Sequence, residues 1–172
     1  NTCVWGRSAP HLGEMARLVE RERAVFWEVF FLVPVGRGAL LEGLTAAGCE
    51  EAFEVLRRNH EGKGYILKVT EAPHYRRFLA ERQEHERGRV GPARGREEPI
   101  GLAERGVNAG LGFLFVSHRG EIYPSGFLPV SAGNARTHRL AAVYRESPLF
   151  RALRDPDRLK GRCGRCPFRR LC

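Results

Sequence analysis

Residues 25–33 read Val-Phe-Trp-Glu-Val-Phe-Phe-Leu-Val, and this stretch decides the fold. The run is almost continuously apolar, is rich in residues that favour strands, and shows no clear alternation with polar positions. Such a run is typical of a strand that is buried on both faces, as strands of parallel sheets are. Pro34 and Gly36 end it. We therefore expect a buried parallel strand in the first half of the chain.

Helical and strand patterns alternate around this run. Apolar residues at helical spacing predict helices over residues 10–22 and about 48–60, and Glu71-Ala72-Pro73 starts a third helix. A short strand is expected over residues 65–70. The order of helices and strands predicts an α/β sheet.

The chain has 172 residues, of which 42% are hydrophobic and 28% are charged. This composition excludes a disordered tail and a small disulfide-stapled scaffold. No apolar run is long enough to cross a bilayer, and no secretory signal is visible, so we expect a cytoplasmic protein without a membrane partner.

A change of composition predicts a boundary between two modules. Between about residues 88 and 108 the sequence consists mainly of Gly, Pro, Arg and Glu, which is typical of a linker. We therefore expect one module over residues 1–87 and a second over residues 109–172.

The second module has shorter elements. Residues 112–117 and 121–123 are β-rich and flank His118-Arg119-Gly120, which predicts a β-hairpin. A helix is expected near residues 138–146. Another helix starts at Ser147-Pro148, a capping residue followed by a proline at the first helical position.

Charge and cysteines gather at the end of the chain. The formal net charge is +9, and residues 151–172 hold eight basic and two acidic residues. Cys163, Cys166 and Cys172 lie in the same segment with the spacing C-x2-C-x5-C. Three clustered thiols cannot all pair with one another, and cytosolic disulfides are rare, so this spacing favours a metal centre.

The identity of the metal follows from the ligand types. Structural zinc more often has two separated C-x2-C pairs, or one C-x2-C pair with two histidines, and no H-x3-5-H follows the cysteines here. Iron–sulfur ligation is therefore favoured, with zinc and no metal as alternatives. Because a thiolate-ligated cluster is anionic, the surrounding arginines would offset its charge. On the zinc alternative the basic segment would contact nucleic-acid phosphates, although it has no interleaved aromatic residue except Phe168.

The second module resembles the SPASM or twitch auxiliary-cluster domain of radical SAM enzymes. Four features carry this resemblance: residues 113–129, the Gly133-Asn134 pair, the helix start at Ser147-Pro148 and the C-x2-C-x5-C segment. The first half is similar to the end of a radical SAM barrel. There Asn1-Thr2-Cys3-Val4 resembles the end of a late strand, and residues 26–38 resemble the final strand.

This resemblance implies an α/β fold in which residues 1–87 form the C-terminal part of a partial (β/α)6 barrel. Residues 109–172 would form a small α+β domain with a β-hairpin. The similar groups are those that act in heme maturation and peptide modification. The intact enzyme would therefore modify a peptide or a tetrapyrrole-like small molecule by hydrogen abstraction, with nucleic acid not expected as a partner.

The resemblance also implies cofactors. Cys163, Cys166 and Cys172 would bind an auxiliary [4Fe-4S] cluster. The intact enzyme would use S-adenosylmethionine and a second [4Fe-4S] cluster, with flavodoxin or ferredoxin as electron donor. Asn1 and Thr2 would lie near the bound cofactor.

Two departures from the family pattern matter. Ser125 stands where the hairpin often has a cysteine, so we expect one auxiliary cluster, whose fourth ligand would lie beyond residue 172. The C-x3-C-x2-C motif that generates the radical is also absent from these 172 residues. We therefore expect the chain to be a C-terminal fragment that is inactive by itself.

Other candidate site residues follow the predicted strands. Glu71 and His74 could transfer protons, and Arg37, Arg76 and Arg77 could hold a substrate carboxylate. The alternative is that Glu71 caps a helix and the arginines are solvated.

The two remaining cysteines, Cys3 and Cys49, are expected in the core, where a free thiol packs as a small apolar group.

Overall fold

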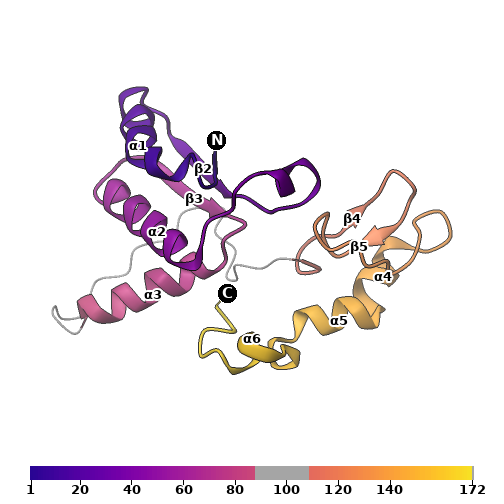
Figure 1. Cartoon of the computed structure of the whole chain (residues 1–172). Coiled ribbons are helices and arrows are strands. Elements are labelled where there is room, and N and C mark those ends of the chain that lie inside the picture. Colours follow the sequence, from indigo (N-terminus) through magenta and orange to yellow (C-terminus); the bar gives the residue numbers. More distant parts are fainter. Residues whose placement is uncertain (88–108, 172) are drawn as a thin grey trace. The chain divides into compact units, whose positions relative to one another are not determined.

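The computed structural model describes residues 1–87 and 109–171 and divides the chain into two units, residues 1–102 and 103–172 (Figure 1). The linker predicted over residues 88–108 lies outside the described residues. Each unit is a mixture of helices and strands, which agrees with the predicted α/β character at this coarse level.

The first unit contains a three-stranded parallel sheet in the order β1-β2-β3. The strands are β1 (Thr2–Val4), β2 (Phe26–Phe31) and β3 (Ile66–Thr70). In the register, Thr2 lies opposite Val29, and Phe26 lies opposite Ile66. The predicted strands over residues 25–33 and 65–70 are thus present, with the first of them shorter than expected.

Helices connect the parallel strands, as such connections require. The connecting helices are η1 Ala9–His11, α1 Leu12–Arg21, η2 Gly36–Leu40 and α2 Ala46–His60. The helix α3, His74–Arg87, follows β3. The three predicted helices are confirmed. Thr45 begins α2, because its hydroxyl accepts a hydrogen bond from the Gly48 N–H at 3.0 Å.

One face of the sheet packs against these helices and forms the core. Trp27, Val29 and Phe31 are buried on this face and belong to one core cluster with residues of α1, α2 and α3. Phe53 of α2 is fully buried, and its ring centroid lies 5.1 Å from that of Phe31 and 5.7 Å from that of Phe78. Aromatic pairs at these distances add to the free energy of burial.

The expectation that β2 is buried on both faces is wrong. Burial alternates along the strand, and Phe26 is 42% exposed. Phe26 and Phe30 are apolar although they point away from the helices, so the sequence lacks the alternation that would have indicated a strand covered on one face.

Within residues 109–171, the second unit is built on a short hairpin, three α-helices and one 3-10 helix. Its elements are β4 Phe115–Val116, β5 Ile122–Tyr123, α4 Leu140–Glu146, α5 Pro148–Arg154, η3 Pro156–Arg158 and α6 Gly161–Arg165. The predicted hairpin is confirmed by antiparallel pairing of Phe115 with Tyr123. Ile122, Val143 and Phe150 form the buried core of this unit.

Replacing Phe53 with alanine should destabilise the first unit by about 3–5 kcal/mol, because it opens a cavity between three aromatic rings. Urea unfolding followed by tryptophan fluorescence measures this loss, since both tryptophans, Trp5 and Trp27, lie in the first unit. Phe26→Ala is the matched control and should cost about 1 kcal/mol or less, because its side chain is partly exposed. Equal losses for the two variants would contradict the proposed core.

Candidate metal centre

The segment before the cysteines is ordered by Asp155 and Pro156. Pro156 cannot continue the hydrogen bonding of α5, which ends at Arg154. The Asp155 carboxylate then accepts a hydrogen bond from the Asp157 N–H at 3.0 Å and caps η3. Ser147, by contrast, occupies the N-cap position of α5 without a capping hydrogen bond from its side chain. The chain then passes through η3 into α6.

Cys163 and Cys166 lie on one tight turn. Cys163 belongs to α6, and Cys166 is the residue that follows its end. The Cys166 N–H donates a hydrogen bond to the Cys163 carbonyl at 3.2 Å. The two cysteines of the C-x2-C motif are therefore linked through the backbone, without any contribution from a metal.

Gly164 lies inside this turn and has no room for a side chain. A Cβ atom at this position would overlap the carbonyl oxygen of Leu159, which belongs to the backbone and cannot move aside. The glycine of the C-x2-C motif is thus required by the close approach of two backbone segments.

Asp157 holds the residues after Cys166. Its carboxylate accepts from Arg169 at 3.1 Å and from Arg170 at 2.5 Å. The pKa of Asp157 lies below its usual value. The hydrogen bond from Arg169 is the largest cause, and the hydrogen bond from Arg170 and the charges of both arginines lower the pKa further. The chain that leads to Cys172 is consequently attached to η3 at a defined point.

The donor set fits part of a thiolate-ligated metal site. Cys163 is exposed, Cys166 is half-buried, and both thiols are free. Cys172 lies outside the described residues, and no group of three His, Cys, Asp or Glu side chains suited to a metal occurs in residues 1–87 and 109–171. Two thiols on one turn can supply two ligands of such a site.

The candidate acid–base residues lie where β3 ends. Glu71 is exposed and adopts a left-handed backbone conformation, with φ +61°. His74 begins α3, and its ring packs edge-on against Phe53 with centroids 4.8 Å apart. Burial, and then the nearby Arg77 charge, lower the pKa of His74, which favours the neutral imidazole. The proton-transfer role of both residues stays a prediction.

The candidate arginines differ in their surroundings. Arg37 lies exposed in η2, and Arg76 is half-buried on α3. Arg77 donates to Glu50 of α2 and to Glu81, so it stabilises the contact between two helices. The substrate-binding role proposed for Arg37 and Arg76 stays a prediction, and Arg77 is already paired.

The candidate cofactor residues lie at the start of β1. Asn1 is exposed, and the Thr2 hydroxyl accepts a hydrogen bond from the Trp27 indole at 2.9 Å.

Cys3, expected in the core, is exposed because it points away from the helices, so that expectation is wrong. Cys49 packs against the core as predicted, and burial raises the pKa of its thiol.

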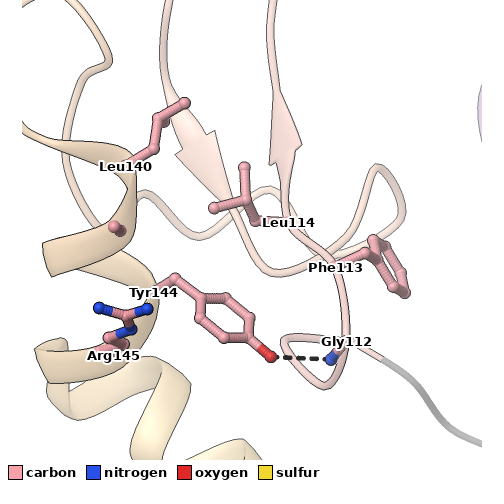
Figure 2. A pocket seen from close by; sticks show the side chains of 7 residues that line it. Gly112, Phe113, Leu114, Leu140, Tyr144 and Arg145 are labelled. Carbon is pink, nitrogen blue, oxygen red and sulfur yellow. Dashed lines mark hydrogen bonds between the residues drawn. The ribbon is translucent and has the colours of Figure 1, made fainter.

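Sequence reasoning missed a pocket in the second unit. Figure 2 shows Tyr144 reaching from α4 to the backbone of Gly112, where its hydroxyl accepts a hydrogen bond at 2.8 Å. The apolar residues Leu140, Ala141 and Tyr144 share one face of α4 at helical spacing, and this was the available signal. Their partner lies more than 25 residues earlier in the chain, which no local pattern indicates.

Comparison with known proteins finds relatives of one kind. Over its whole length the chain is similar to proteins named AdoMet-dependent heme synthase. It is 35% identical to the one from Oleidesulfovibrio alaskensis, 34% to the one from Methanosarcina barkeri and 34% to the one from Nitratidesulfovibrio vulgaris. The match covers 100% of this chain but 44%, 48% and 47% of those proteins, so the chain spans about half the length of the curated relatives that it matches.

Neither a family model nor a solved structure matches the chain. Among the residues that the structure describes, none of the helices has both the length and the apolar character needed to span a membrane.

Asp157→Asn should release the segment after Cys166, because a neutral amide binds two guanidinium groups less strongly than a carboxylate does. Hydrogen exchange at the amides of Arg169 and Leu171, both hydrogen-bonded in this segment, should become faster. In the wild-type chain the ion pairs should persist below pH 3.8, the ordinary pKa of Asp, and be lost as pH falls through the lowered pKa of Asp157.

Glu146→Gln is the control for this change, because Glu146 is exposed and has no ion pair with another described residue. It should leave the exchange of both amides unchanged. A carboxyl titration of Asp157 at or above pH 3.8 would contradict the proposed attachment.

Proposed function

We propose that the chain is the C-terminal part of a radical SAM enzyme and that residues 109–172 form a SPASM- or twitch-like module with one auxiliary [4Fe-4S] cluster. The observation that carries this proposal is the similarity of the whole chain to AdoMet-dependent heme synthases. The turn that joins the free thiols of Cys163 and Cys166 supports the cluster.

The names of the relatives favour a tetrapyrrole over a peptide as the substrate of the intact enzyme. Hydrogen abstraction from the substrate would depend on S-adenosylmethionine and a second [4Fe-4S] cluster. These require a C-x3-C-x2-C motif, which the 172 residues do not contain. Flavodoxin or ferredoxin is the proposed electron donor, and the cytoplasm is the proposed compartment.

In this proposal Cys163, Cys166 and Cys172 are the iron ligands. The cluster, when bound, would pass or accept one electron. Asp157 positions the chain between the second and third ligands through its two arginines. Gly164 allows the close backbone approach that the ligand turn requires.

Residues 1–87 are proposed to supply the last strands of the barrel. Three parallel strands with helices on one face are what such a segment needs. Glu71 and His74 are the proposed proton-transfer residues, and Arg37 and Arg76 the proposed carboxylate ligands. Asn1 and Thr2 are the proposed neighbours of the cofactor.

Anaerobic reconstitution of the chain with iron and sulfide should give a brown protein with broad visible thiolate-to-iron absorption and comparable amounts of iron and sulfide. Cys163→Ala or Cys166→Ala should remove most of the bound iron, because each variant lacks a ligand thiolate. Iron, sulfide and zinc analysis of each protein is the measurement.

Cys3→Ala is the matched control, since it removes an exposed thiol from the first unit. It should leave the iron content unchanged. One zinc per chain without sulfide would overturn the cluster and support the zinc module instead. Equal iron loss in all three variants would show that the iron binds thiols without selectivity.

The chain alone should form no 5′-deoxyadenosine when it is incubated with dithionite and S-adenosylmethionine, because it lacks the radical-generating motif. Chromatography of the reaction mixture provides the measurement. Deoxyadenosine above the level of a protein-free control would contradict the proposed division of roles.

A further inference from the structure

The turn that joins Cys163 and Cys166 has a backbone geometry that suits a disulfide. The hydrogen bond from the Cys166 N–H to the Cys163 carbonyl, at 3.2 Å, closes a turn of four residues. The Cα atoms at the two ends of such a turn lie within about 7 Å of each other, and bridged cysteines have Cα atoms about 4.4–6.8 Å apart. Residues three apart also lie on the same side of a helical turn. The backbone is therefore compatible with a bond between the two sulfurs.

Contacts on both sides of the turn fix its conformation. The Gly164 N–H donates a hydrogen bond to the Lys160 carbonyl at 3.2 Å, and the Leu159 carbonyl oxygen leaves no room for a Cβ atom on Gly164. Pro167 follows Cys166 and restricts the backbone there. A turn that is already fixed loses little conformational freedom when its two ends are bridged, so reaction within the turn is favoured over reaction with a distant cysteine.

The two cysteines of the turn differ in exposure. Cys163 is exposed and Cys166 is half-buried, and both thiols are free. Thiol–disulfide exchange runs in two steps, of which the first needs a thiol that dissolved molecules can reach and the second needs a neighbouring thiol. Cys163 suits the first step. Cys166, on the same turn, suits the second.

The other described cysteines have no such neighbour. Cys3 lies on β1 and points away from the helices, whereas Cys49 lies on α2 and packs against the core on the helix side of the sheet. The sheet therefore separates Cys3 from Cys49. Among the four described cysteines, Cys163 and Cys166 are the pair that shares a turn.

Positive charge surrounds the exposed thiol. Lys160, Arg162 and Arg165 are exposed, and they form no ion pair within residues 109–171. Residues 158–172 contain no acidic residue, and Asp157 is already paired with two other arginines. Such a surface attracts anions and raises their local concentration. An anionic disulfide should therefore reach Cys163 faster than a cationic one.

We propose that Cys163 and Cys166 form a reversible disulfide in the metal-free chain by exchange with an anionic low-molecular-weight disulfide. The Cys163 thiolate attacks one sulfur of the small disulfide, and the first small thiol leaves. The Cys166 thiolate then attacks the Cys163 sulfur of the mixed disulfide and releases the second small thiol. Two electrons pass from the two cysteines to the small disulfide, and the two protons of the cysteines end on the two small thiols.

The bridge is a reversible protection of an empty metal site. Sulfur in a disulfide is not a thiolate ligand, so the bridge and a metal exclude each other. A bridged cysteine is also shielded from irreversible oxidation to the sulfinic and sulfonic acids. This protective role rests on the proposed function, because it assumes that the two sulfurs bind a cluster. Formation of the bridge depends only on the turn and its charges.

Incubation of the reduced, metal-free full chain with glutathione disulfide tests the proposal. Remaining thiols are then alkylated, and tryptic peptides are identified by mass spectrometry. Peptides 163–165 and 166–169 should be linked to each other by a disulfide and carry no glutathione. Dithiothreitol should restore both thiols. Lasting glutathione on Cys163 of the wild-type chain, or linkage of Cys163 or Cys166 mainly to Cys172, would overturn the proposal.

Cysteine variants separate the two steps of the exchange. Cys172→Ser should form the bridge at a rate within about twofold of the wild-type rate, because its thiol takes no part. Adding Cys166→Ser to this variant should leave glutathione bound to Cys163, since no second thiol releases it. Loss of the bridge in Cys172→Ser, or a double variant that keeps no glutathione on Cys163, would contradict the proposed sequence of attack.

The role of charge is tested with two disulfides of opposite sign. Arg162→Gln should slow the reaction with anionic glutathione disulfide about twofold and should accelerate the reaction with cationic cystamine. Arg119→Gln is the matched control, because Arg119 is exposed in the hairpin turn of the same unit, far from the cysteines in sequence. It should change neither rate. Equal effects of both variants, or effects of the same direction with both disulfides, would overturn the preference for an anionic disulfide.

The bridge and the cluster fail separately, because the bridge assay contains no iron. A chain that forms the bridge but holds no iron and sulfide after reconstitution overturns the cluster alone. A chain that holds iron and sulfide but forms no bridge when metal-free overturns the bridge alone. The reconstituted chain should not form the bridge while its cluster is bound. Equal rates of bridging with and without bound iron and sulfide would overturn the protective role.

Discussion

Parallel pairing of β2 with both of its neighbours is the constraint on which the first unit depends. Because β1, β2 and β3 run in one direction, each connection must cross back over the sheet. The connection from β1 to β2 and the connection from β2 to β3 have the same handedness, so α1 and α2 lie on the same face of the sheet. The core forms on this face. The same constraint brings the ends of the strands to one edge, where Arg37 follows β2 and Glu71 and His74 follow β3.

The other face of the sheet carries charge among aromatic residues. Glu28 lies opposite Lys68 in the register, and its carboxylate accepts from the Lys68 ammonium at 2.7 Å and from the Thr70 hydroxyl at 3.1 Å. The hydrogen bond from Lys68 lowers the pKa of Glu28 despite the opposing effect of burial. Phe26 lies beside this pair along β2 and is partly exposed. Because this face of the sheet carries both charged and aromatic side chains, it is better suited to line a partly polar interior than to pack against a second layer of helices. In the proposed barrel, this face would line the interior.

The features that the sequence predicted are the local ones. Helix periodicity identified α1 and α2. Cysteine spacing singled out Cys163 and Cys166 as a pair, and the structure places both on one turn. The one-sided burial of β2 and the exposure of Cys3 depend on which elements cover the sheet, and a strand's own residues do not contain that information. The attachment of Arg169 to Asp157 and of Tyr144 to Gly112 joins residues that are far apart in the chain, so spacing alone could not reveal either contact.

The basic residues of the last segment divide into two groups. Four of them hold the second unit together: Arg151 and Arg154 donate to backbone carbonyls, and Arg169 and Arg170 bind Asp157. The other four form no ion pair or side-chain hydrogen bond within residues 109–171, and they are Arg158, Lys160, Arg162 and Arg165. These four lie immediately before or between the two cysteines. Phe168, the aromatic residue nearest to them in sequence, is half-buried, which leaves little surface for stacking a base. In the proposed function these four positive charges would offset the negative charge of a thiolate-ligated cluster.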